Sequence, residues 1–463
     1  MNLNKKVFLK NTSYSLIANI VSMAVGMLAL ILFPKMLGIE AYGLYQLYLF
    51  FDGYVILTSF GLSDGIYLEY GGIEYDKINK KTLKEQFYLL IIWQFFTYLF
   101  FFVIILLIDD NIIKKLIYMG TLLTGIITQP RYFIQMILQA TNRIKEYGII
   151  ILIERIISIG LSLILLLLGL NYFWLPIIVD IFGRLISLIY GIFECKDFII
   201  LPKIKLDFFS KKILIKSLNF IKQGIMILIV SLASTIIIGV YRYGIQYQWD
   251  IIVFSKVSLT ISLSNMFIRA INAIAIVLFP ALKNIGIVEL KRIYKKIDQG
   301  IIVIVATCLV LYYPASKILV WWLPNYKDSF YFAAFLLPIC FYESKSALLI
   351  FTYLKALRKE KQLFIINIIT FFVSLVFMII GVIVIKNIIV TLLFILLSTM
   401  IRCILGEFYI DNLLNLKLNK SICLSIIFNI AFVILNVQGS NITWFIFIIV
   451  YLIFIYKIMR LKA

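Results

Sequence analysis

Long apolar runs recur along the whole chain and alternate with short polar stretches. An α-helix needs about 20 mainly apolar residues to cross the hydrocarbon core of a bilayer. Runs of about this length occupy residues 13–33, 42–62, 86–108, 113–139, 146–169, 172–193, 221–244, 250–281, 299–318, 329–354, 362–385, 388–410, 420–437 and 441–458. The pattern therefore predicts an all-α polytopic membrane protein with about 14 transmembrane helices.

Lysine and arginine are distributed unevenly between alternate connections of this pattern. If the runs cross the membrane in turn, the side of the N-terminus carries 30 of the 44 cations, the opposite side carries 7, and 7 lie inside runs. Positive residues accumulate on cytoplasmic loops, so both termini are predicted to be cytoplasmic. The first run follows Lys5, Lys6 and Lys10 and has no clear small-residue cleavage site, which favours a retained span over a signal peptide.

The spacing of the runs indicates an internal repeat. In each half a short outer loop joins the first two runs, and a long basic inner loop follows the second. We therefore predict a six-helix bundle over 1–194, a cytoplasmic interfacial connection over 195–222, a second six-helix bundle over 223–410, and two additional transmembrane helices over 411–463. Parallel repeats of this kind enclose a substrate cavity between the bundles.

Composition excludes several classes of protein. Hydrophobic residues make up 63% of the chain and charged residues 14%, and the mean hydropathy is +1.04, values outside the range of soluble domains. The chain has no histidine, and its five cysteines form no CxxC pair, so neither a catalytic constellation nor a metal site is predicted. The net charge of +21 follows mostly from topology, and binding to nucleic acid is not needed to explain it.

The run 250–281 carries a polar stripe. Serine, asparagine and arginine side chains recur there at steps of three and four residues, which places them on one side of a helix. Such a stripe should face a protein interior or a water-filled cavity rather than lipid. The stripe consists of Ser255, Ser258, Ser262, Asn265, Arg269 and Asn272, of which Ser258, Ser262, Asn265 and Asn272 are predicted to line the cavity.

Charged residues inside the predicted spans are functional candidates, because they are expensive in a membrane. The cations are Arg131, Arg155, Arg184, Lys256, Arg269, Lys345 and Arg402, and the acids recognised among them are Asp52, Glu154, Asp180 and Glu343. This inventory predicts a net cationic interior. Arginine suits phosphate oxygens, so we expect Arg269, Arg402, Arg184, Arg131 and Lys256 to bind the phosphates of an anionic substrate.

The four acids have two interpretations. They are candidates for coupling transport to H⁺ or Na⁺, and they are equally candidates for structural ion pairs. Asp180 and Arg184 lie one helical turn apart, so pairing and a role in binding are equally supported. For Asp52 we favour pairing with an arginine, and Glu154 and Glu343 need partners on other helices.

Several segments resemble the Wzx-like oligosaccharide flippases of the polysaccharide transporter family, in the superfamily that also contains the MATE exporters and the lipid II flippases. The resemblance is carried by NTSYSLIANIVSMAVGMLALILFPKMLGIEAYGLYQLYLF (11–50), SFGLSDGIYLEYGG (59–72), QPRYFIQMILQATNRIKEY (129–147) and IIGVYRYGIQYQWDIIVFSKVSLTISLSNMFIRAINAIAIVLFPALK (237–283). It implies export of an undecaprenyl-pyrophosphate-linked oligosaccharide from the inner to the outer leaflet by alternating access.

This resemblance also implies a setting. The protein would lie in a bacterial cytoplasmic membrane and use no cofactor apart from a coupling ion. Its partners would be membrane lipids, glycosyltransferases and a polysaccharide polymerase of surface polysaccharide biosynthesis. Three alternatives remain open: a lipid II flippase, although the first run has no charge between Asn11 and Pro34; a MATE-like small-molecule exporter; and a membrane-embedded polysaccharide polymerase or glycosyltransferase, for which Asp109–Asp110 is the one outer acidic candidate.

Overall fold

A computed structural model describes residues 5–108, 111–200, 210–283, 287–357, 359–414, 416 and 420–460, and the side chains of these except 5–19, 269–283, 287–288 and 420. Every regular element in these residues is a helix, and the chain divides into two compact units, Met1–Ser231 and Leu232–Ala463. The division lies inside one helix, α10. The predicted bounds at 194, 222 and 410 remain predictions.

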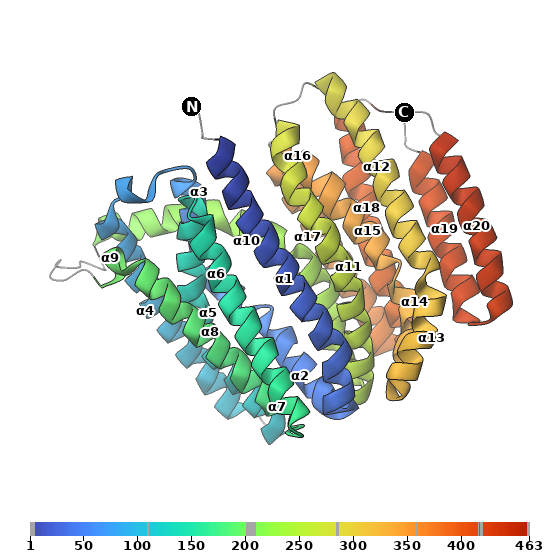
Figure 1. Cartoon of the computed structure of the whole chain (residues 1–463), viewed down its shortest axis with the longest axis horizontal. Coiled ribbons are helices and arrows are strands. Elements are labelled where there is room, and N and C mark those ends of the chain that lie inside the picture. Colours follow the sequence, from blue (N-terminus) through green and yellow to red (C-terminus); the bar gives the residue numbers. More distant parts are fainter. Residues whose placement is uncertain are drawn as a thin grey trace. The chain divides into compact units, whose positions relative to one another are not determined.

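The first unit contains helices that are coloured blue to green in Figure 1. Its elements are α1 (Lys5–Leu37), α2 (Ile39–Asp52), η1 (Val55–Ser59), α3 (Leu62–Tyr70), η2 (Tyr75–Lys77), α4 (Lys80–Leu107), α5 (Ile112–Ala140), α6 (Ile144–Arg155), η3 (Ile156–Leu161), α7 (Ser162–Leu167), α8 (Trp174–Glu194), α9 (Lys196–Ile199) and the first part of α10 (Lys211–Gln248). Helix α8 packs on α5 and α6, α4 packs on α5, and α1 packs on α6.

The second unit contains the remainder of α10 and the elements that follow it. They are α11 (Ile251–Lys283), α12 (Ile287–Val310), α13 (Tyr312–Trp322), η4 (Pro324–Tyr326), α14 (Lys327–Leu336), α15 (Ile339–Lys345), η5 (Ser346–Phe351), α16 (Thr352–Ala356), α17 (Glu360–Met378), η6 (Ile379–Val384), α18 (Ile388–Leu413), α19 (Lys420–Val437) and α20 (Asn441–Arg460). Helix α18 packs on α14, α15 and α17, while α19 and α20 pack on each other.

The apolar helices are those of a multi-pass membrane protein. Nine helices among the described residues are long and apolar enough to cross a bilayer, and the number is eleven if two bent pairs are each one span. The bends are 45° between α12 and α13, and 47° between the segments 324–336 and 339–356. The predicted number of fourteen and the cytoplasmic position of both termini stay predictions.

One predicted helix differs from the observed ones. The apolar run 42–62 is not one helix, because α2 ends at Asp52 and the chain continues through η1 to a left-handed turn at Phe60 and Gly61, with φ of 50° and 82°. The interfacial connection over 195–222 stays a prediction, and α10, which begins within that range, runs without interruption from Lys211 to Gln248.

The surface of α4 shows why the first unit suits a lipid environment. Phe95, Phe96, Phe100 and Leu107 are among its most exposed side chains, whereas Phe87 is buried among aromatic and aliphatic residues from α5 and α9. A soluble protein would not expose such a continuous apolar face. The hydrocarbon core of a membrane is the environment in which this face is stable.

Glycines allow α3 and α10 to approach each other closely. A Cβ atom added at Gly224 would lie 1.9 Å from the carbonyl oxygen of Gly61, and one added at Gly65 would lie 2.0 Å from the carbonyl oxygen of Phe220. Both obstacles are backbone atoms, which cannot rotate away as a side chain can. The crossing of α3 and α10 therefore depends on the absence of side chains at these positions.

We predict that Gly224→Ala destabilises the protein, because the backbones of α3 and α10 must separate to admit the methyl group. Overpacking of this kind costs roughly 1–3 kcal/mol, measured as the free energy of unfolding in mixed micelles. Gly26→Ala is the matched control, since a Cβ at Gly26 on α1 meets nothing within 4 Å. Equal stability of the two variants would contradict the close crossing.

Candidate functional site

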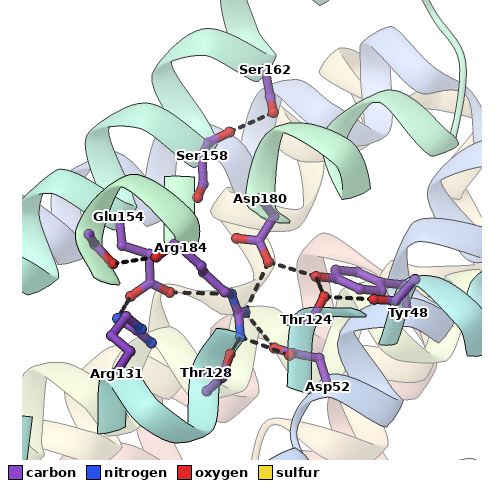
Figure 2. Close-up of polar contacts among 12 residues, drawn as sticks. Tyr48, Asp52, Thr124, Thr128, Arg131, Glu154, Ser158, Ser162, Asp180 and Arg184 are labelled. Carbon is purple, nitrogen blue, oxygen red and sulfur yellow. Dashed lines mark hydrogen bonds and ion pairs between the residues drawn. The ribbon is translucent and has the colours of Figure 1, made fainter. Parts of the chain in front are cut away.

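Buried charged side chains gather at one place in the first unit (Figure 2). We call this group the Arg184 cluster. A charge in an apolar interior is stable only when it is paired, so these side chains act together. The members are Asp52 on α2, Arg131 on α5, Glu154 on α6, and Asp180 and Arg184 on α8.

The guanidinium group of Arg184 lies at the centre of this cluster. Its Nη1 and Nη2 atoms donate hydrogen bonds to the two carboxylate oxygens of Asp52, at 2.9 and 2.6 Å. Nη2 also lies 2.9 Å from Oδ2 of Asp180, and Nη1 donates to the hydroxyl of Thr128 at 2.9 Å. A two-point contact between a guanidinium and a carboxylate is the geometry in which arginine binds oxyanions strongly.

Glu154 connects the two arginines of the cluster. One carboxylate oxygen accepts a hydrogen bond from Nη1 of Arg131, and the other lies 3.6 Å from Nε of Arg184. The helix changes character two residues after Glu154, where the π-helical segment η3 begins. Such segments are rare and occur frequently at functional sites, because one additional residue per turn changes the direction of the side chains.

Hydroxyl groups complete the surroundings of Asp180. The phenol of Tyr48 on α2 donates to Oδ2 of Asp180 at 2.7 Å and lies 2.8 Å from the hydroxyl of Thr124 on α5, as Figure 2 shows. Asp180 therefore receives a charged donor and a neutral donor. The contacts of this carboxylate and of the Tyr48 phenol therefore link α2, α5 and α8.

The second unit holds a similar arrangement around Arg402 on α18. Its Nη1 atom lies 3.1 Å from Oε1 of Glu343 on α15 and donates to the hydroxyl of Ser234 on α10 at 2.6 Å. Its Nε atom donates to Oδ1 of Asn367 on α17 at 2.9 Å. The guanidinium carbon lies 4.6 Å from the centroid of the Phe351 ring, so one face of the group is covered by an aromatic side chain.

The two arginine sites occupy matching places in the predicted repeat. The fourth, fifth and sixth apolar runs carry Arg131, Glu154 and Arg184, and the tenth, eleventh and twelfth carry Glu343, Asn367 and Arg402. In both units the arginine of the last run contacts the side chains of the two preceding runs, directly in the second unit and through the shared Glu154 in the first. This correspondence supports two copies of one plan.

A second cluster in the same unit surrounds Lys345 on α15. Its Nζ atom lies 2.9 Å from Oδ1 of Asp298 on α12 and forms an ion pair with Glu407 on α18. Lys345 is 1% exposed, and both acids are 2% exposed. Lys345 directly precedes a π-helical segment, η5, just as Glu154 on α6 lies two residues before η3.

The predicted net cationic interior is wrong for the side chains that the structure describes. Eight acidic side chains are buried there against five basic ones. The arginines expected to bind phosphate are not free of acids either, because Arg131, Arg184 and Arg402 each lie in an ion pair. The buried acids are Asp64, Glu85, Glu154, Asp180, Asp298, Glu343, Glu407 and Asp411.

Several predicted contacts are confirmed. Asp52 pairs with an arginine, Asp180 pairs with Arg184 one turn away, and Glu154 and Glu343 find partners on other helices. Each of the four acids therefore has a cationic partner, as the pairing interpretation predicts. Coupling to H⁺ or Na⁺ is not tested by them and stays a prediction.

The predicted polar stripe on α11 is described in part. Lys256 lies near one end of the helix with its Nζ atom 2.5 Å from Asp328, and Ser258 is buried and accepts a hydrogen bond from Arg242 at 3.1 Å. Ser262 and Asn265 are half-buried. The side chains of Arg269 and Asn272 lie outside the described residues.

Five buried acids among the described residues were missed by the sequence analysis, and three of them, Asp298, Glu407 and Asp411, lie in the second unit. Glu407 lies inside the predicted span 388–410, and its position there was sufficient to identify it. Asp298 and Asp411 lie one residue outside predicted spans, so a boundary shift of one residue would have included them. Helix ends are the least certain part of such predictions, which is why these two residues were assigned to loops.

The fold resembles those of known transporters. It matches the lipid II flippase MurJ in an inward closed conformation with a TM-score of 0.68 and 17% identity, over 96% of this chain and 98% of that one. It matches an inward-facing multidrug resistance MATE family transporter with a TM-score of 0.54 and 13% identity, over 86% and 98% of the two chains. The chain has the fold of MOP-superfamily transporters.

A further match within that fold is a MOP superfamily transporter from Pyrococcus furiosus, with a TM-score of 0.51 and 12% identity over 89% of this chain and 96% of that one. No protein-family model matches the chain. No curated protein matches it either. The MOP fold therefore comes from the structure, and the substrate has to be inferred from the chemistry of the site.

We predict that Arg184→Ala lowers the free energy of unfolding by roughly 3–5 kcal/mol, because it leaves the buried carboxylates of Asp52 and Asp180 without their shared cation. The measurement is equilibrium unfolding in mixed micelles. Adding Asp180→Asn should restore part of the loss, since one of the uncompensated charges is then removed. Arg292→Ala, at an exposed position of α12, is the control and should change stability by less than about 0.5 kcal/mol.

Proposed function

We propose that the protein is a flippase that moves a polyprenyl-pyrophosphate-linked oligosaccharide from the inner to the outer leaflet of a bacterial cytoplasmic membrane. The fold supports transport, because it is shared with the lipid II flippase MurJ over almost the whole of both chains. The resemblance of several segments to Wzx-like flippases supports the oligosaccharide. Surface polysaccharide enzymes, such as glycosyltransferases and a polymerase, would supply and use such a substrate.

The observation that carries this proposal is the pair of buried arginines at matching places in the two units. Arg184 and Arg402 each present two or three N–H donors to oxygen atoms of neighbouring helices. Two oxygens of a phosphate group are negatively charged, as those of a carboxylate are, and can accept the same two-point hydrogen bonds from a guanidinium group. An incoming pyrophosphate would therefore exchange with acidic partners rather than bind to free cations.

Exchange of partners gives a physical reason for alternating access. While the arginines hold carboxylates from several helices, they tie those helices together, as Asp52 ties α2 to α8. A phosphate that replaces a carboxylate breaks one such tie. The binding energy of the substrate would then be used to change the packing of the helices, which is what coupling between binding and movement requires.

A second candidate is a MATE-like exporter of cationic small molecules. The excess of buried acids over buried bases among the described side chains favours it, because a cationic substrate needs a negative site. The acids nearest to Arg184 already have a cationic partner, which counts against this alternative at the Arg184 cluster. The experiment below separates the two candidates.

We predict that the purified full chain in proteoliposomes increases the rate at which a labelled polyprenyl-pyrophosphate-linked oligosaccharide becomes accessible to an external, membrane-impermeant glycosidase. Arg402→Lys should lower the initial rate by about tenfold or more, because it retains the charge but loses the donor to Asn367. Lys327→Gln, at an exposed position of α14, should transport as the unaltered protein does.

Two results would reject the proposal. An unaltered rate for Arg402→Lys would remove the phosphate-binding role of that arginine. Transport of a cationic dye, with no change in the accessibility of the lipid-linked oligosaccharide, would favour the exporter in place of the flippase.

A further inference from the structure

The Lys345 cluster, defined by Lys345, Asp298 and Glu407, has one cation between two carboxylates from different helices. Lys345 projects from α15, Asp298 from α12 and Glu407 from α18. Nζ of Lys345 lies 2.9 Å from Asp298 Oδ1 and also pairs with Glu407 Oε1. The three side chains are nearly inaccessible, so water cannot stabilise the second negative charge.

Other titratable side chains of the described residues surround Glu407. The titratable groups that face Glu407 from the packed helices are Tyr294 and Asp298 on α12, Tyr342 and Lys345 on α15, and Cys403 and Asp411 on α18.

With both Asp298 and Glu407 ionised, Lys345 shares its single positive charge between two carboxylates in an apolar interior. Such a site is stabilised when one carboxylate takes up a proton, since a neutral carboxyl group is much less costly to bury than a carboxylate. Asp298 is well suited to stay charged, because its Oδ2 accepts a hydrogen bond from Ser421 at 2.8 Å in addition to the ion pair.

Glu407 is the acid best placed to take the proton. Its Oε1 atom contacts Lys345 and receives a long hydrogen bond of 3.5 Å from the thiol of Cys403. Its Oε2 atom is buried and accepts no hydrogen bond within the described part of the chain. A carboxylate with one buried oxygen left without a donor is poorly stabilised in the charged form.

We propose that Glu407 is a proton-binding site. Its protonation weakens the ion pair between Lys345 and α18, so that Asp298 on α12 becomes the main ionic partner of Lys345. The proton comes from the aqueous phase, and the single bond that forms is O–H on Glu407. A proton fits better than a metal ion, because the ammonium group of Lys345 already lies between the carboxylates and would repel a second cation.

Protonation at this place changes which helices are held together. Two ion pairs join α15 to α18. Helix α15 supplies the acid in Glu343–Arg402 and the base in Lys345–Glu407. Neutral Glu407 loses most of its attraction for Lys345, so α15 remains tied to α18 through Glu343 alone and to α12 through Asp298. One proton therefore shifts the balance between two helix contacts within the second unit.

The use of this site in transport rests on the proposed flippase function, in which Glu407 would couple the movement of the substrate to a proton gradient. The proton-binding site itself does not depend on the identity of the substrate. The two statements can therefore be tested separately on the same protein.

The test is infrared difference spectroscopy of the full chain in lipid vesicles, between acidic and alkaline pH. We expect a band of a protonated, buried carboxyl group that disappears in Glu407→Gln. Glutamine has almost the same shape and can still accept a hydrogen bond from Lys345, so this variant should fold. Glu289→Gln, at an exposed position of α12, is the matched control and should retain the band.

A second variant tests whether the band depends on the neighbouring cation. Lys345→Met removes the positive charge between Asp298 and Glu407, so the band should persist to higher pH. An unchanged spectrum in Glu407→Gln, or a band in Lys345→Met that titrates as in the unaltered protein, would overturn the proposal.

The transport assay with an imposed pH gradient then tests coupling. Loss of the dependence on the gradient in Glu407→Gln, with downhill movement retained, supports coupling at this site. If the lipid-linked oligosaccharide is not moved at all while the band of Glu407 is present, the flippase function fails and the proton-binding site stands.

Discussion

An ionised side chain in the middle of an apolar helix bundle must find its counter-charge inside the protein, because neither lipid nor water can supply it. This constraint explains the ionic contacts at the buried arginines of the two units. Arg184 is held by Asp52 and Asp180, and Arg402 is held by Glu343. The ionic contacts in turn favour the packing of these helices on one another, because separating two of them would leave a buried charge without its partner.

The same constraint explains why the buried arginines are paired with carboxylates and are not left free to bind a substrate. A site for an anionic substrate that is open and empty would cost several kcal/mol for each bare guanidinium. In the proposed flippase, carboxylates that occupy the site before the substrate binds would avoid that cost and give the substrate a partner to replace. Phosphate recognition and the stability of the bundle would then rely on the same donors.

That the chain is an all-helical, multi-pass membrane protein was predictable from the sequence because it depends on composition over many residues. The favoured pairing of Asp52 and the need for partners beyond their own helices at Glu154 and Glu343 also followed from the sequence. The particular partners did not, because rotation and packing of whole helices decide that Glu343 meets Arg402 and Lys345 meets Glu407. The break after Asp52 was hidden for a similar reason. It depends on the close contact of Gly61 with Gly224, which is more than 160 residues away.

The π-helical segment η5 begins directly after Lys345, and η3 begins two residues after Glu154. A wide turn of this kind holds one residue more than an ordinary α-helical turn while most backbone groups remain bonded. Deleting a single amino acid from either segment would thus permit an unbroken α-helix, in contrast to the usual effect of a deletion in a membrane span. A deletion from a regular α-helix rotates one side by about 100° relative to the other, whereas here the wide turn already absorbs the additional residue, so Glu154 or Lys345 would keep its direction toward its partners.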